Sequence, residues 1–287
     1  MLSKNKRIFL VCGAMLTTGL VLFLFSRSVN SDSVDGVSPI VQIISENPDD
    51  KPSIVLLKHA FWIVHSGFDY DSYKTDLLKS IADEFKVQGA SELSDTVNEL
   101  YTKYKPKSAT NSYDYPPIMY NRKWFEVDEL VLKEKKYEEA IKLSNNDPFA
   151  LTMIAVNLYE DTQNKSKAVE LLKDAYTQIQ PNTEDRKPLV QRIIKSYIEI
   201  EEYNEAFQLF KESGVEELNG SQSLPLIEFF TKQQELDVVF DLVSKTTPVD
   251  VQAAGLIRIA KYIDNQKPLD EKYRKFLKDL LSSVSPK

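Results

Sequence analysis

The sequence predicts an all-α protein, built as a solenoid of antiparallel helix pairs. Its 287 residues contain only 8 glycines against 14 tyrosines and 14 phenylalanines, which disfavours β-sandwiches and glycine-rich nucleotide loops. One four-residue pattern occurs four times: a small or β-branched residue, an apolar residue, a residue of any kind, and leucine. Its copies begin at Ala140, Ala168, Ala206 and Val239, at intervals of 28, 38 and 33 residues. A period near ~34 residues indicates stacked helix pairs, because one pair cannot bury its apolar face alone.

The first element is a segment without charge, residues 8–25, which is long enough to cross most of a ~30 Å hydrocarbon core. Lys4, Lys6 and Arg7 precede it, so the positive-inside rule places the N-terminus in the cytoplasm and the body outside. We therefore expect residues 1–27 to be the anchor of a single-pass protein of the bacterial inner membrane, with a periplasmic body. Cleavage as a signal sequence is the alternative, although such sequences usually have an apolar core of only ~7–15 residues.

Residues 28–38 are small and polar and predict a flexible tether. The body then begins with an N-terminal helical block, residues 39–104. Within it, residues 53–64 are apolar nearly all round, which predicts a buried helix too short to span a bilayer. Further apolar stripes at helical spacing predict two more helices, over residues 77–85 and 93–104.

Residues 105–118 contain three prolines in a polar run, which interrupts the helical pattern and predicts a linker. The alternative, a proline-rich recognition motif, stays open. The remaining residues, 119–287, are expected to form the helical-repeat domain. Its last helices would cap the array, because a stack of repeats needs a polar outer face at its end.

The repeats resemble the tetratricopeptide family over residues 121–246. Trp124 falls at the fourth position of a first unit, and the eleventh positions hold aromatic or apolar residues in all four copies. The segments Tyr137-Glu-Glu-Ala140 and Tyr203-Asn-Glu-Ala206 are similar to the start of that family's second helix. The eighth position departs from the family, because it lacks the expected small residue.

The resemblance implies that the first helix of each unit lines a concave, partner-binding face. The fifth and ninth positions of these helices would contact a protein or peptide ligand. They are Phe125, Glu129, Met153, Asn157, Gln191, Lys195, Leu224 and Glu228. Ordinary exposed helix residues are the alternative interpretation. The basic, asparagine-rich carboxylate clamp of some family members is not reproduced, since only Asn157 fits it.

Catalytic and metal sites are not expected. His59 and His65 are the only histidines, and six residues on a helix leave them about 120° off a shared face. The single cysteine, Cys12, lies in the membrane segment, which excludes a disulfide framework and a four-ligand zinc site of cysteine and histidine. Neither a Gly-x-Ser-x-Gly motif nor a phosphate-binding glycine loop occurs, so we expect no cofactor.

Charge argues against nucleic-acid binding. Beyond residue 27 the chain carries 32 basic and 43 acidic side chains, and an acidic surface is repelled by a phosphate backbone. The sequence therefore predicts a non-enzymatic, membrane-anchored scaffold for protein or peptide partners, acting in envelope assembly, secretion or the folding of translocated proteins. Two alternatives remain: an exported hydrolase or lyase with an α-helical body, and a secreted binding protein released by signal cleavage.

Overall fold

The computed structural model describes residues 43–45, 47–67, 72–104 and 126–283. Every regular element among them is helical, and the one extended pairing in this part of the chain is a bridge between Leu218 and Thr246. The predicted all-α class is therefore confirmed. None of the described helices is long and apolar enough to cross a membrane. The predicted anchor (8–25), tether (28–38) and linker (105–118) lie outside the described residues.

The N-terminal block consists of three helices, α3 (Pro52–Gly67), α4 (Ser72–Val87) and α5 (Ser91–Tyr104). The apolar residues of α3 lie on all its faces, and Val55, Leu57 and Phe61 are fully buried. A helix of this kind must be covered by several neighbours. Helix α4 packs on α3, and α5 packs on α4.

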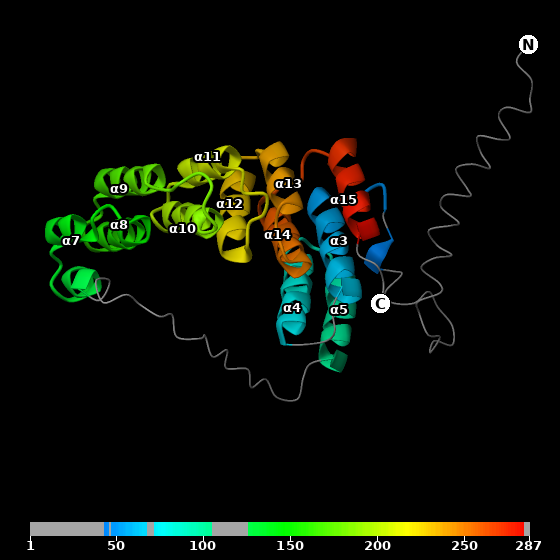
Figure 1. Cartoon of the computed structure of the whole chain (residues 1–287). Helices are drawn as coiled ribbons and strands as arrows, with labels where there is room; N and C mark the ends of the chain where they lie inside the picture. The colour runs from blue at the N-terminus through cyan, green and yellow to red at the C-terminus, as the bar shows by residue number, and fades with distance from the viewer. Residues whose placement is uncertain (1–42, 46, 68–71, 105–125, 284–287) are drawn as a thin grey trace, which may run out of the picture.

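The rest of the described chain is a succession of short helices that lie in two rows (Figure 1). It begins with residues 126–133, whose last turn is the π-helix η1 (Glu129–Lys133). The following helices are α7 (Tyr137–Ser144), α8 (Pro148–Thr162), α9 (Lys165–Thr177), α10 (Arg186–Glu199), α11 (Tyr203–Ser213), α12 (Gly220–Lys232), α13 (Leu236–Ser244), α14 (Val249–Tyr262) and α15 (Glu271–Ser283). Helices α8, α10, α12 and α14 form what we term the first-helix row, and α9, α11 and α13 the second-helix row.

Local sequence sets the ends of these helices. Asp147 caps α8 by accepting a hydrogen bond from the Ala150 amide at 2.9 Å, and Pro148 takes the first helical position, where its missing N–H is not needed. Asn219 and Gln222 form a capping box at the start of α12. Gly214 ends α11 with a positive φ of 75°, a conformation that glycine adopts without steric cost.

Packing joins the N-terminal block to the opposite end of the chain. Helix α3 lies against α14, and the buried residues of both belong to one hydrophobic core. Helix α15 packs on α3 and reaches α13 through a stacked pair of rings, Phe240 and Tyr273, whose centroids are 4.5 Å apart. The parts of the chain on either side of residues 105–118 therefore share a core, although the sequence indicates a boundary between them.

Candidate functional site

The predicted binding residues lie on the first-helix row and on the helix that precedes it, except for Phe125, which is outside the described residues. Glu129 and Lys195 are exposed. The other five residues are half-buried: Met153, Asn157, Gln191, Leu224 and Glu228. These residues come from η1, α8, α10 and α12, and each of these elements packs on the next. Helices α8, α10 and α12 follow one another along the row (Figure 1).

The two apolar candidates, Met153 and Leu224, are partly covered by neighbouring residues. Met153 packs against the core with part of its side chain. Leu224 lies between two glycines, because a methyl group added at Gly220 or at Gly255 would meet it at 3.9 or 4.0 Å. Each side chain therefore has a covered side and an accessible side, as an apolar anchor of a binding face would have.

Three polar candidates make contacts within their own helix. Lys195 pairs with Glu199 at 3.3 Å, and Glu129 pairs with Lys133 at 3.2 Å. The amide of Asn157 donates to the carbonyl oxygen of Met153 at 2.9 Å. Such exposed i, i+4 pairs contribute only about 0.3–0.5 kcal/mol, so a partner could replace them at low cost.

Gln191 and Glu228 instead connect neighbouring parts of the fold. The side-chain amide of Gln191 donates to the backbone carbonyl of Glu217 at 3.2 Å, and the backbone carbonyl of Gln191 accepts from the side-chain amide of Gln222 at 2.6 Å. Glu228 accepts from Lys232 at 2.7 Å and from Arg258 of α14 at 2.5 Å. The hydrogen bond from Lys232, with Arg258 nearby, keeps the pKa of Glu228 below its ordinary range. These contacts hold α10, α12 and α14 in a fixed relation.

A contact that the sequence did not predict is centred on Arg192. Its guanidinium lies 3.5 Å from the ring centroid of Phe149 on α8, and its Nε donates to the Thr152 hydroxyl at 2.9 Å. Burial raises the pKa of Asp128, in the preceding helix, while the charge of Arg192 acts in the opposite direction. Arg192 therefore connects α10 to α8, and its charge also acts on Asp128 of the preceding helix. The only signal in the sequence is its place beside the predicted Gln191.

The two histidines occupy separate environments on α3. His59 is buried, and its Nδ1 is 2.8 Å from the Val55 carbonyl oxygen. His65 stacks on Phe61 with ring centroids 5.6 Å apart and an interplanar angle of 8°. Burial, reinforced by the charge of Lys74, lowers the pKa of His65 to about 4. In the described part of the chain, no three histidine, cysteine, aspartate or glutamate residues are grouped so that they could hold a metal ion.

The lowered pKa of His65 predicts a pH-dependent stability. The His65 imidazole becomes protonated near pH 6.5 in the unfolded chain but only near pH 4 in the folded chain. The folded state is therefore fully stable with respect to this group above pH 6.5, and its free energy of unfolding falls as the pH falls from 6.5 to 4. The loss from this group is on the order of 3 kcal/mol. His65→Phe, which keeps a ring on Phe61, should therefore flatten the fall in melting temperature from pH 7 to pH 4.5. Equal pH slopes for the variant and the parent chain would contradict this prediction.

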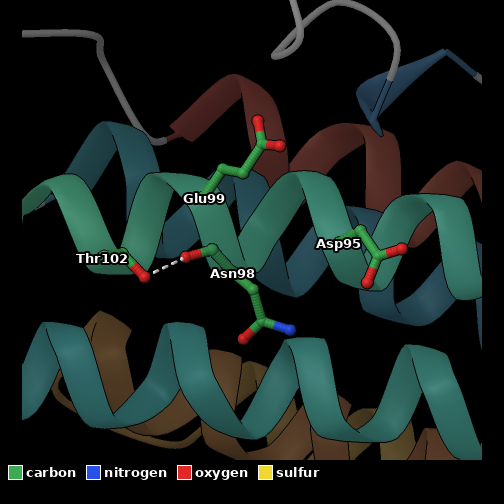
Figure 2. Close-up of a pocket in the computed structure, with 4 residues that line it drawn as sticks. All are labelled: Asp95, Asn98, Glu99 and Thr102. Atoms are coloured by element: carbon green, nitrogen blue, oxygen red, sulfur yellow. Dashed lines mark hydrogen bonds between the residues drawn. The ribbon is translucent and has the colours of Figure 1, made fainter.

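A shallow surface depression lies elsewhere, on α5, lined by Asp95, Asn98, Glu99 and Thr102 (Figure 2). The Thr102 hydroxyl donates to the Asn98 carbonyl at 2.8 Å, a bond within the helix. Asn98 and Glu99 point in opposite directions, so the side chains do not converge on a common point (Figure 2). The first-helix row therefore remains the candidate site.

Comparison with known proteins places this row within a recognised family. No curated protein matches the chain, and no solved structure does. Residues 118–268 match the family described as "Family of unknown function (DUF5717) N-terminal". The matched segment runs from before η1 to beyond α14, and it includes the whole first-helix row. Because it covers more than half of the 287 residues, the chain belongs to this family.

Proposed function

We propose that the protein is a non-enzymatic scaffold that binds protein or peptide partners through its first-helix row, which acts as the inner face of a tetratricopeptide-like solenoid. Residues 8–25 anchor it in the membrane, with the body on the extracytoplasmic side. The observation that supports this proposal best is the alternation of half-buried apolar and polar side chains along the row, from Met153 on α8 to Leu224 and Glu228 on α12.

The fit to a peptide partner rests on shape and chemistry. An extended chain needs apolar contacts for affinity and polar groups for orientation, and it needs both along a length of surface. Met153 and Leu224 supply the apolar contacts, while Asn157, Gln191 and Lys195 supply polar groups between them. The connections made by Arg192 and Arg258 hold successive helices together. A surface that is already organised loses less entropy on binding.

One labelling experiment tests both topology and binding. Lys195→Cys on α10, in a Cys12→Ser chain, would be labelled on intact cells with a membrane-impermeant, photoactivatable maleimide. Gln208→Cys on α11 is the matched control, because Gln208 is also exposed but lies on the second-helix row. We expect labelling without permeabilisation at both positions, and after illumination discrete protein adducts at position 195 only.

Two results would contradict the proposal. Labelling that requires permeabilised cells would place the body in the cytoplasm. If no adduct forms at position 195, or if adducts are equally abundant at position 208, the first-helix row is not the binding face.

A further inference from the structure

Positive charge is concentrated on three neighbouring helices of the first-helix row. Helices α10, α12 and α14 carry seven basic and three acidic side chains. The second-helix row, α9, α11 and α13, carries four basic and six acidic ones. Helix α8, at the other end of the first-helix row (Figure 1), has two acidic side chains and no basic one. In a chain with a net charge of −7, the row is therefore basic towards α14 and acidic towards α8.

At the α14 end of the row, three cations surround one carboxylate in what we call the basic cluster: Lys232, Arg258 and Lys261 around Glu228 and Tyr262. Lys232 Nζ lies 2.7 Å from Glu228 Oε1, and Arg258 Nη1 lies 2.5 Å from Glu228 Oε2. The Nζ atoms of Lys232 and Lys261 lie 4.6 and 5.3 Å from the ring centroid of Tyr262. Within the described part of the chain, Glu228 is the only carboxylate that pairs with these cations. The basic cluster therefore has an excess of positive charge.

This excess charge is accessible on the predicted binding face. The side chains of Lys232 and Arg258 are 52% and 40% exposed, and Lys261 is also exposed. Glu228 is one of the predicted contact residues, and the half-buried Leu224 lies one turn before it on α12. Exposed cations attract an oppositely charged group and orient it, while an adjacent apolar side chain adds contact area. The surface thus offers both kinds of contact within one turn of a helix.

We propose that the partner of the first-helix row is an acidic segment of a protein chain, whose aspartate or glutamate side chains bind at the basic cluster while an apolar side chain contacts Leu224. This partner chemistry rests on the proposed function, to which it adds the charge of the ligand and its placement. The acidic part of the segment lies at the α14 end of the row, because the carboxylates of α8 repel it.

The separation of Leu224 and Glu228 sets the spacing within that segment. Four residues of an α-helix rise ~6 Å, and side chains two positions apart in an extended peptide lie ~6.6 Å apart on the same face. We therefore expect an apolar residue and an acidic residue with a single residue between them. A carboxylate at the basic cluster is attracted by three cations and repelled by Glu228 alone, so its net interaction is favourable.

Selection from a random peptide library tests this chemistry. The probe is a library of peptides of about 12 residues whose C-termini are fused to a phage coat protein, so that no peptide has a free terminal carboxylate. The target is the full-length chain in mild detergent. We expect the selected peptides to contain about twice the aspartate and glutamate of the input library. The affinity of a selected peptide should fall about tenfold between about 50 and about 300 mM NaCl, because salt screens exposed charges.

The variant Lys232→Glu with Lys261→Glu reverses the two lysines of the basic cluster. Both side chains are exposed, so the melting temperature of the chain should change little. The variant should lose the preference for acidic peptides, and a peptide selected by the parent chain should bind it about tenfold less tightly or worse.

Lys173→Glu with Lys211→Glu, on α9 and α11, is the matched control because it changes the net charge by the same amount. Lys173 pairs with Glu205 at 3.5 Å, and Lys211 Nζ lies 5.5 Å from the ring centroid of Phe207. The control therefore also removes one ion pair and one contact between a lysine and a ring. It should keep the preference for acidic peptides and bind a selected peptide within about twofold of the parent chain.

Three results would overturn the acidic partner while leaving the row as a peptide-binding face. They are selected peptides without an excess of acidic residues, equal affinities or equal losses in the two double variants, and selection only from a second library with free C-termini. The last result would assign the binding to a terminal carboxylate. If the chain selects no peptide from either library, the proposed function fails as well.

Discussion

Replacing Phe61 with alanine should lower the free energy of unfolding by about 3–5 kcal/mol, among the largest losses that a single core substitution causes. Phe61 is fully buried in α3 and lies within the core that the N-terminal block shares with α14. The variant would lose the transfer free energy of the ring and leave a cavity that the surrounding helices fill only partly. Urea unfolding followed by far-UV circular dichroism measures this loss.

The same variant should also weaken α14, some 190 residues further along the chain. Helix α14 buries Leu256 and Ile259 completely, and α3 is a principal neighbour. If the two helices unfold as one cooperative unit, amide hydrogen exchange in residues 249–262 should accelerate together with exchange in α3.

Val87→Ala is the control within the same block, because Val87 is 75% exposed at the end of α4. Its effect on stability should stay within about 0.5 kcal/mol. A Phe61→Ala chain in which exchange quickens in α3–α5 but not in α14 would show that the block and the array unfold independently. The contacts between them would then contribute little to stability.

The sequence predicts the positions of the helices in this fold better than it predicts which helices pack against each other. The recurring four-residue pattern and the all-round apolar segment at residues 53–64 identify the helices, because periodicity depends only on local side-chain order. The contact between α3 and α14 joins residues about 200 positions apart. Gln88 and Asn265, which form a hydrogen bond of 3.0 Å just beyond the ends of α4 and α14, are polar residues and carry no periodic signal. Such pairings follow from tertiary packing alone.

At the candidate site too, the sequence predicts on which helix a residue lies but not which residues it contacts. Repeat spacing places Met153, Gln191, Leu224 and Glu228 on one row of helices, because spacing fixes helical phase. It does not show that Glu228 is joined to Arg258, thirty residues away, and so is less available to a partner than its position suggests. Nor does it identify Arg192, whose contacts with Phe149 and Thr152 depend on the separation between α8 and α10. These distances are set by packing.

The double change Met153→Gln with Leu224→Gln should weaken partner binding about 100-fold while the chain stays folded. The two side chains are the half-buried apolar residues among the predicted contacts, and each exposes part of its surface to solvent. Loss of about 1–1.5 kcal/mol of apolar contact at each position gives this factor. Glutamine is close in size to both side chains and replaces their apolar ends with a polar amide. The readout is the yield of the partner adduct formed at Lys195→Cys.

The matched control is Val169→Gln with Val238→Gln, on α9 and α13. These valines are also half-buried and packed against the core, but they lie on the second-helix row. Both double variants should therefore lose similar stability, within about 1 kcal/mol of each other, so that a difference in adduct yield reports binding and not folding. If the two variants lose the adduct equally, the first-helix row has no special role. If instead His65→Phe abolishes the cellular activity in a folded chain and the row variant retains it, the histidine region carries the function and the scaffold proposal fails.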